Sequence, residues 1–297
     1  MEALVKGSVT ALITPFTEDF KVDYGCLGAL IERQIENNTK AILVAGTTGE
    51  GSTLSDREFK KIIKEAKKIC ESRVPLWVGA GSNNTHRASE KGKIAAEAGA
   101  DLLLELTPFY NKTNDEGILR HFEHIAENVP VPIIIYNVPS RTGYDISPLS
   151  VKRLSLHPNI VGIKEASSDI NKTAEIINLV SEKFYVYSGN DNLALPVLSL
   201  GGKGVVSVAS NLYPEAMASL CELAEEGKFN EARKQQLSLL NVMNALFLEV
   251  NPIPVKAAME CLGLSNSAVR LPLCKMGREN LIRLKKALRD YGSLRSL

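Results

Sequence analysis

A lysine stands inside one of the most apolar stretches of this sequence. In "IVGIKEASSD", Lys164 follows Ile160 and Ile163. A buried ammonium is costly unless it is paired, whereas a desolvated neutral amine is a nucleophile that forms a Schiff base with a carbonyl compound. The alternative is a structural ion pair, for which Glu165 is a poor partner because adjacent residues of a strand point to opposite faces. Position alone leaves both hypotheses open.

Polar residues that could assist such an amine follow other apolar runs. In "GTTGE", backbone N–H groups and the hydroxyls of Thr47 and Thr48 can bind a carboxylate or phosphate, although Thr47 and Glu50 also fit a helix-capping box. Tyr136 ends "VPIIIY", where a phenol fits a proton shuttle or a satisfied core tyrosine about equally well. Arg141, in a loop after Pro139, can bind a carboxylate through two hydrogen bonds or be merely solvated.

Two further motifs carry less weight. "GGKG" at 201–204 could be a phosphate loop, but a tight turn fits it better. His121 and His124 form an H-x-x-H without a carboxylate in ligand spacing, which favours a solvated helix face over a metal site. The sequence therefore predicts no metal.

About eight short apolar runs, separated by amphipathic segments, must position these residues. The runs begin near residues 8, 40, 75, 100, 131, 159, 184 and 204. They are mostly non-alternating, as strands buried on both faces are. This pattern predicts a (β/α)8 TIM barrel; a doubly wound open sheet is the alternative, but no G-x-G-x-x-G follows the first run. In such a barrel the carboxyl ends of the strands meet at one mouth, so the polar residues should converge there.

The helical segments show the expected apolar faces. The clearest is "DREFKKIIKEAKKICES", which a capping box of Ser55 and Glu58 should start. Its predicted buried face consists of Phe59, Ile62, Ile63, Ala66 and Ile69. The chain after about residue 214 shows only helical patterns. We therefore expect a catalytic barrel over 1–224 and a C-terminal helical domain over 225–297.

Composition excludes several classes of protein. The formal net charge is +1 and no long block of one sign occurs, which argues against binding to nucleic acid or to an anionic membrane. The five cysteines are scattered and never in C-x-x-C spacing, so neither a disulfide framework nor a zinc site is indicated. No stretch approaches the roughly 18 apolar residues of a membrane helix. We expect a soluble cytoplasmic protein.

Taken together and in order, several motifs resemble one known family. "GSVTALITPF", "GTTGE", "TPFYNK", "YNVPSRTG", "GIKEAS" and "NPIPVKAAMECLG" resemble the dihydrodipicolinate synthase family of pyruvate-dependent class I aldolases, which also include N-acetylneuraminate lyase. The resemblance covers nearly the full chain. It implies a barrel with a helical C-terminal domain and condensation of pyruvate with aspartate 4-semialdehyde to 4-hydroxy-tetrahydrodipicolinate, in lysine and diaminopimelate biosynthesis. It implies no metal or organic cofactor, and a homotetramer built from tight dimers.

The resemblance also implies catalytic roles for four residues. Lys164 looks like the lysine that forms the Schiff base with pyruvate. Tyr136 looks like the phenol that relays protons, and Thr47 resembles the hydroxyl that links it to a second phenol. Tyr110 resembles that second phenol, which in the family comes from the neighbouring subunit.

Four more residues match substrate-binding positions of the family. Thr48 resembles the residue that holds the carboxylate of pyruvate, and Arg141 resembles the arginine that receives the carboxylate of aspartate semialdehyde. Gly189 and Val206 match positions that line the pocket.

Three other functions compete with this hypothesis. A sialic-acid or sugar-acid lyase of the same superfamily would share Lys164, Tyr136 and "GTTGE", but the enzymes resembled here generally lack Arg141. A non-catalytic binding barrel could dispense with Lys164 or Tyr136. A pyridoxal-phosphate barrel would need a phosphate loop, for which only "GGKG" stands.

Regulation by lysine is expected to be weak, because the chain departs from the lysine-sensitive members that it resembles. Those members carry an acidic residue and a tyrosine where this chain has Arg87 and Phe109. Asp56 and Phe59 stand where sensitive members tend to have histidines, while Asn83 is retained. Asp56 could in principle replace the missing acidic contact.

Overall fold

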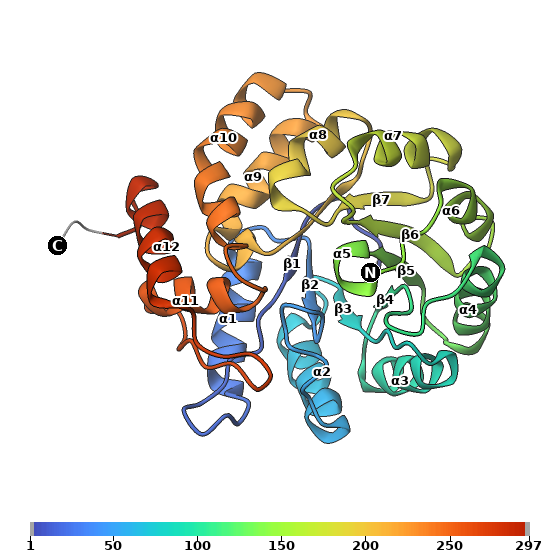
Figure 1. Cartoon of the computed structure of the whole chain (residues 1–297), viewed down its shortest axis with the longest axis horizontal. Helices are drawn as coiled ribbons and strands as arrows, with labels where there is room; N and C mark the ends of the chain where they lie inside the picture. The colour runs from blue at the N-terminus through green and yellow to red at the C-terminus, as the bar shows by residue number, and fades with distance from the viewer. Residues whose placement is uncertain (1–2, 295–297) are drawn as a thin grey trace.

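Eight parallel strands close into a barrel in the computed structural model, which describes residues 3–294 (Figure 1). Each strand pairs with the next along the chain, and β8 pairs with β1 to close the ring. The strands are β1 (Gly7–Ala11), β2 (Ala41–Val44), β3 (Leu76–Gly79), β4 (Leu102–Leu106), β5 (Ile133–Asn137), β6 (Ile160–Glu165), β7 (Tyr185–Ser188) and β8 (Gly204–Ser207). The predicted TIM barrel is therefore confirmed, and each of the eight apolar runs contains one strand.

The strands are apolar on both faces because each face is buried against a different layer. Leu43, Leu104 and Val206 belong to the cluster inside the barrel. Their neighbours in the same strands, such as Leu103 and Val205, belong to the larger cluster between the barrel and the helices. Burial on both faces explains why the sequence shows runs rather than alternation.

Helices surround the barrel and follow its strands. They are α1 (Tyr24–Glu36), α2 (Asp56–Cys70), α3 (Thr85–Ala98), α4 (Asp115–Asn128), α5 (Pro139–Thr142), α6 (Pro148–Leu154), α7 (Ile170–Leu179), α8 (Ala194–Ser199) and α9 (Pro214–Glu225), with 3-10 turns η1 (Asp191–Leu193) and η2 (Ala209–Asn211). The capping box of Ser55 and Glu58 at the start of α2 is confirmed. On its buried face Cys70 is fully buried and Ile69 only partly, so the expected face is shifted slightly at its end.

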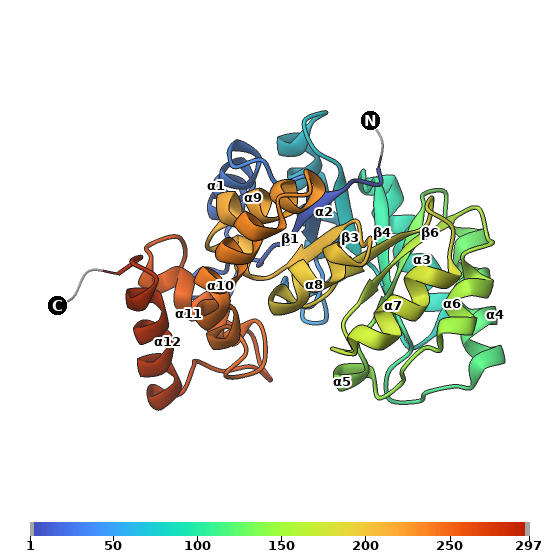
Figure 2. The ribbon, with the colours of Figure 1, turned by 90° about the horizontal axis from the view of Figure 1, so that it is seen from above.

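Three further helices complete the chain: α10 (Phe229–Ala245), α11 (Ile253–Cys261) and α12 (Arg278–Asp290). They lie at one side of the molecule, with α12 farthest from α4 and α6 (Figure 2). The C-terminal helical region is thus confirmed. The division at residues 224 and 225 falls at the end of α9, and its status as a domain boundary stays a prediction.

One local prediction is wrong, and another is confirmed. His121 is buried in α4 rather than solvated, with Nδ1 2.9 Å from the Thr85 hydroxyl, whereas His124 is exposed. Burial lowers the pKa of His121 to about 4. The segment at 201–204 forms the predicted turn, in which Gly201 has a φ of +100°.

Among the described helices, none has both the length and the apolar character needed to cross a membrane.

Candidate active site

Lys164 lies in β6 near the carboxyl end of the barrel, between Tyr136 of β5 and Tyr187 of β7 in the strand register. Its side chain is buried, and Nζ lies 4.2 Å from the centre of the Tyr136 ring. Within residues 3–294 no carboxylate oxygen lies within 4.0 Å of Nζ. The structural ion pair considered for Lys164 is therefore absent from this part of the chain, and the amine faces a phenol instead.

Glu165 points away from Lys164, as the alternation of a strand requires. Its carboxylate accepts hydrogen bonds from Asn137 Nδ2 at 2.9 and 3.2 Å and from Ser167 N at 2.6 Å. These partners place Glu165 on the outer side of β6. It supports the end of the strand and leaves Lys164 free of a salt bridge to its neighbour.

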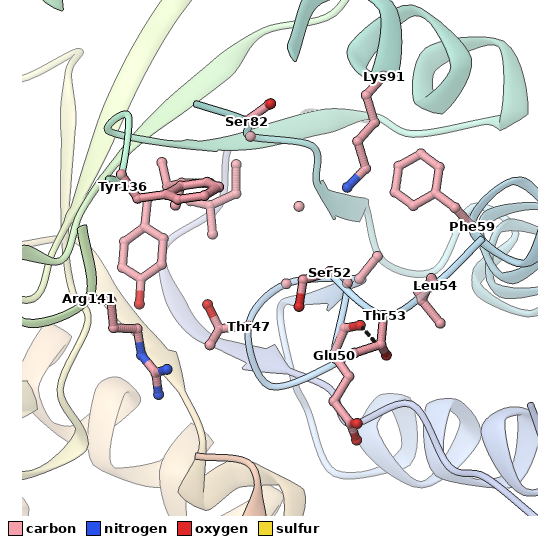
Figure 3. A pocket seen from close by; sticks show the side chains of 18 of the residues that line it. Thr47, Glu50, Ser52, Thr53, Leu54, Phe59, Ser82, Lys91, Tyr136 and Arg141 are labelled. Atoms are coloured by element: carbon pink, nitrogen blue, oxygen red, sulfur yellow. Dashed lines mark hydrogen bonds between the residues drawn. The ribbon is translucent and has the colours of Figure 1, made fainter. Parts of the chain in front are cut away.

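Two adjoining cavities open at this end of the barrel. The smaller, of about 160 Å³, is lined by Lys164, Thr48 and Gly189 together with Thr47, Tyr136 and Arg141. The larger, of about 750 Å³, shares Thr47, Tyr136 and Arg141 and continues towards Lys91 and Phe59 (Figure 3). Six of the eight predicted site residues therefore meet around one enclosed space.

The loop after β2 presents the two threonines. Figure 3 shows the Thr47 side chain and the Tyr136 phenol facing each other across the cavity. Thr48 is buried, and its Oγ1 accepts a hydrogen bond from Asn251 Nδ2 at 2.9 Å. The loop does not start a helix at Thr47, so the capping box considered for Thr47 and Glu50 does not form. The hydroxyls remain available for a ligand.

Arg141 lies on the short helix α5 rather than in an irregular loop. Pro139 begins this helix, where a missing N–H costs no hydrogen bond. The guanidinium donates from Nη2 to the backbone oxygen of Asn251 at 3.2 Å and lies at the border of both cavities. Its exposed position leaves donors free for a carboxylate entering from solvent.

Gly189 follows β7 at a point where no larger residue fits. A Cβ there would lie 2.5 Å from the Ala166 Cβ and 3.0 Å from the Glu165 oxygen. Val206 is fully buried in the inner cluster of the barrel, and Val208 rather than Val206 lines the smaller cavity. The lining role suggested for Val206 stays a prediction.

Tyr110 does not reach the site of its own chain. Its side chain is 90% exposed, and it lines neither cavity. Its φ of +66° is unusual for a residue with a Cβ. The loop after β4 thus directs this phenol outward, away from Lys164.

Two residues of the C-terminal region were not predicted as part of the site. Asn251 contacts both Thr48 and Arg141, and Lys256 forms a buried ion pair with Glu50. Lys256 stands in the apolar stretch "PIPVKAAM", which carries the same signal of a buried lysine that singled out Lys164. Asn251 stands at the start of the motif "NPIPVKAAMECLG", but no local pattern shows its contacts, because its partners are distant in sequence.

This arrangement suits chemistry on a short 2-keto acid. An amine without a salt bridge in the described chain can attack a ketone, and the facing phenol and hydroxyl can carry the protons that imine formation and dehydration require. Thr48 and Arg141 offer donors to carboxylates at two places around the amine. The site therefore fits Schiff-base catalysis on substrates that carry carboxylates.

Comparisons with known proteins agree with this geometry. The sequence pattern of the dihydrodipicolinate synthetase family matches residues 4–291. The 4-hydroxy-tetrahydrodipicolinate synthase of Acetivibrio thermocellus is 49% identical over 96% of this chain and 97% of that protein. The solved structure of a chloride-inhibited dihydrodipicolinate synthase from Acinetobacter baumannii, complexed with pyruvate, shares a TM-score of 0.96 and 41% identity over 98% of this chain and 100% of that one. A dihydrodipicolinate synthase described as the first monomeric variant shares a TM-score of 0.96 and 36% identity, with 98% of each chain covered. The chain thus belongs to the dihydrodipicolinate synthetase family.

Proposed function

We propose that this enzyme condenses pyruvate with aspartate 4-semialdehyde to give 4-hydroxy-tetrahydrodipicolinate, through a Schiff base on Lys164. One observation carries the proposal: the buried Lys164 amine faces the Tyr136 phenol and has no carboxylate within 4.0 Å in the described chain. Membership of the family supplies the reaction and its two substrates.

The reaction begins with attack of Lys164 Nζ on the ketone carbon of pyruvate. The carbinolamine loses water to form an imine, and Tyr136 relays the protons with the Thr47 hydroxyl. Loss of a proton from the methyl carbon gives an enamine, whose carbon bonds to the aldehyde carbon of the second substrate. The amino group of that substrate then attacks the imine carbon and displaces Lys164, which closes the ring. One water is released overall, and neither metal nor organic cofactor is needed for this balance.

Carboxylate recognition divides between two residues. Thr48 binds the carboxylate of pyruvate from the inner end of the smaller cavity. Arg141 binds the carboxylate of aspartate semialdehyde from the exposed border, where its guanidinium keeps free donors. The two acids are thereby held on opposite sides of the bond that forms between them.

The functional unit in this proposal is a homo-oligomer, a homotetramer built from tight dimers, because the exposed Tyr110 completes the site of a neighbouring copy. The monomeric variant among the similar structures shows that assembly differs between proteins of this fold, so it needs its own test. We place the enzyme in the cytoplasm because all five of its cysteines are free, as thiols in a reducing compartment are.

Borohydride trapping tests this function directly. Pyruvate plus borohydride should add one reduced adduct, and mass spectrometry of peptides should locate it on Lys164. Lys164→Arg should abolish the adduct because a guanidinium stays protonated and does not form the imine. An adduct on Lys203 or Lys256 in its place would contradict the assignment, and efficient cleavage of N-acetylneuraminate would favour a sugar-acid lyase.

A further inference from the structure

A fully buried ion pair joins the C-terminal region to the loop that carries Thr47 and Thr48. Lys256 Nζ of α11 lies 2.5 Å from Glu50 Oε1, and the two side chains are 0% and 1% exposed. Lys256 also donates to the Ala268 oxygen at 2.8 Å, and the second carboxylate oxygen of Glu50 accepts from Arg270 N at 2.9 Å. Both charges are therefore well supplied with partners.

Folding stability alone is a weak reason for such a pair. Burial lowers the pKa of Lys256 to about 8 although Glu50 acts to raise it, which shows how strongly the site desolvates the ammonium. Buried ion pairs can often be replaced by apolar residues without loss of stability. What the pair supplies here is a fixed direction and distance between α11 and the loop after β2.

Glu50 is placed so that its side chain sets the path of the loop. It has a φ of +52°, a conformation that residues with a Cβ seldom adopt unless their surroundings impose it. Its backbone N donates to the Thr47 oxygen at 3.1 Å. Figure 3 shows its carboxylate turned away from the Thr47 hydroxyl, although Glu50 is among the residues that line the larger cavity. The carboxylate is thus anchored on one side of the loop while the hydroxyls are presented on the other.

The same C-terminal stretch contacts the loop at a second point. Asn251 lies five positions before Lys256 and donates to Thr48 Oγ1, while its backbone oxygen accepts from Arg141. The stretch 251–256 therefore touches the loop beside Thr48 and at Glu50, and also holds Arg141. A shift of this stretch would therefore move Thr48, which is assigned to the carboxylate of pyruvate, and Arg141, which is assigned to the carboxylate of aspartate semialdehyde.

We propose that the Glu50–Lys256 ion pair is a positioning device for pyruvate, which holds Thr47 and Thr48 against the Lys164 amine. The inference rests on the proposed function, because pyruvate is the ligand whose binding it controls. Glu50 and Lys256 are positioning residues, since neither lines the smaller cavity in which Lys164 lies, although Glu50 lines the larger one.

A double variant separates positioning from stability. Lys256→Met alone leaves a buried carboxylate unpaired and should lower the thermal midpoint. Glu50→Gln/Lys256→Met removes both charges, keeps a carbonyl oxygen for Arg270 N, and should recover most of that stability. The matched control is Lys67→Met, which breaks the ion pair of Lys67 with Asp101, at 2.6 Å, beyond the amino end of β4 and away from the site.

The measurements are the thermal midpoint of each protein and the pyruvate concentration that gives half-maximal borohydride adduct at Lys164. We expect the double variant to need roughly 10- to 100-fold more pyruvate than the wild type. The reason is that a misplacement of reacting groups by about 1 Å can lower the efficiency of a reaction on the order of 100-fold. Lys67→Met should lose stability and keep the wild-type pyruvate dependence.

A double variant that regains both stability and the wild-type pyruvate dependence would overturn the proposal. So would a double variant that fails to fold, since the pair would then be a folding element. If the wild type itself forms no adduct with pyruvate, the proposed function fails instead, and the two failures remain distinct.

Discussion

Lys164 and Lys256 both interrupt apolar stretches of the sequence, and both are buried in the folded chain. Lys256 meets Glu50 at 2.5 Å, whereas Lys164 meets the ring of Tyr136 and no carboxylate within 4.0 Å among residues 3–294. The ion pair with Glu50 engages the side chain of Lys256. The surroundings of Lys164 leave its side chain free to react with a carbonyl carbon. The partner of a buried lysine, rather than its burial, decides which chemistry it can do.

Arg141→Ala should weaken the use of aspartate semialdehyde and leave pyruvate trapping intact. Losing a hydrogen bond between charged groups costs roughly 1.5–3 kcal/mol, or about 10- to 100-fold in kcat/KM for the aldehyde. Steady-state kinetics with each substrate varied, beside the borohydride adduct, make the measurement. Arg120→Ala, on the outer face of α4 where Arg120 pairs with Glu116, is the control and should behave as the wild type. Unchanged kinetics for the aldehyde would remove Arg141 from the site.

Lysine at millimolar concentration should barely inhibit the enzyme. Arg87, Asp56, Phe59 and Phe109 all line the larger cavity, so the residues that depart from the lysine-sensitive pattern do share one space. A guanidinium repels the ammonium of the ligand, and Phe109 offers no hydroxyl to its carboxylate. Initial rates and calorimetry over a lysine titration test this. Half-maximal inhibition below about 1 mM, roughly −4 kcal/mol of affinity, would contradict the prediction.

A carboxyl without a partner lies between strand β4 and the helices. Glu105 alternates with Leu104 of the inner cluster and so faces the helical layer, where it is fully buried with neither oxygen hydrogen-bonded in the described chain. Burial raises the pKa of Glu105 to about 8, against an opposing effect of Lys91. The folded chain therefore keeps a proton that the unfolded chain releases near pH 4.5.

Stability should consequently fall as the pH rises from about 5 to 8, and Glu105→Gln should remove that fall. By linkage, the difference in free energy of unfolding between the wild type and Glu105→Gln changes by on the order of 3 kcal/mol over this range. The change favours the variant at pH 8. Denaturant unfolding at several pH values measures it. The buried His121 has the opposite effect: it lowers the stability of the folded protein as the pH falls from about 6.5 to 4. Both proteins contain His121, so this effect does not separate them. The exposed Glu127→Gln is the matched control; equal slopes for Glu105→Gln and the wild type would refute the prediction.

How far the sequence predicts each element depends on how local its cause is. The eight strands follow from apolar runs because each strand is buried on both faces, and α2 follows from its capping box. The helix pattern predicts a solvated His121, because it does not show that Thr85 of α3 forms a hydrogen bond with this ring. The local pattern leaves a capping box open for Glu50, because its partner Lys256 is 206 positions away. Contacts across the fold leave little trace in a local pattern.

At the scale of the whole chain, the Tyr110 phenol does not take part in the site of its own chain, because its side chain is 90% exposed. Mixing Tyr110→Phe subunits with Lys164→Arg subunits should therefore restore part of the activity, since one site of a mixed dimer keeps both Lys164 and a Tyr110 from its neighbour. Each parent should be nearly inactive. Activity after subunit exchange is the measurement, with light scattering to establish the oligomer.

The control mixes Lys164→Arg subunits with subunits that carry both substitutions, in which no site has a lysine. Restored activity there would point to contamination rather than to shared sites. No restoration in the first mixture after proven exchange, or full activity of a monomer, would contradict the dimer hypothesis.

The reach of Asn251 and Lys256 back to the loop after β2 has a consequence for how the enzyme is made. A ribosome releases the barrel strands up to β8 well before α11, and the ring itself closes only when β8 meets β1. Contacts between such distant parts of a chain carry a loop-closure cost that slows their formation. A nascent chain that ends before Asn251 lacks both contacts to this loop, so we expect the site to be completed only after residues 251–256 have been made.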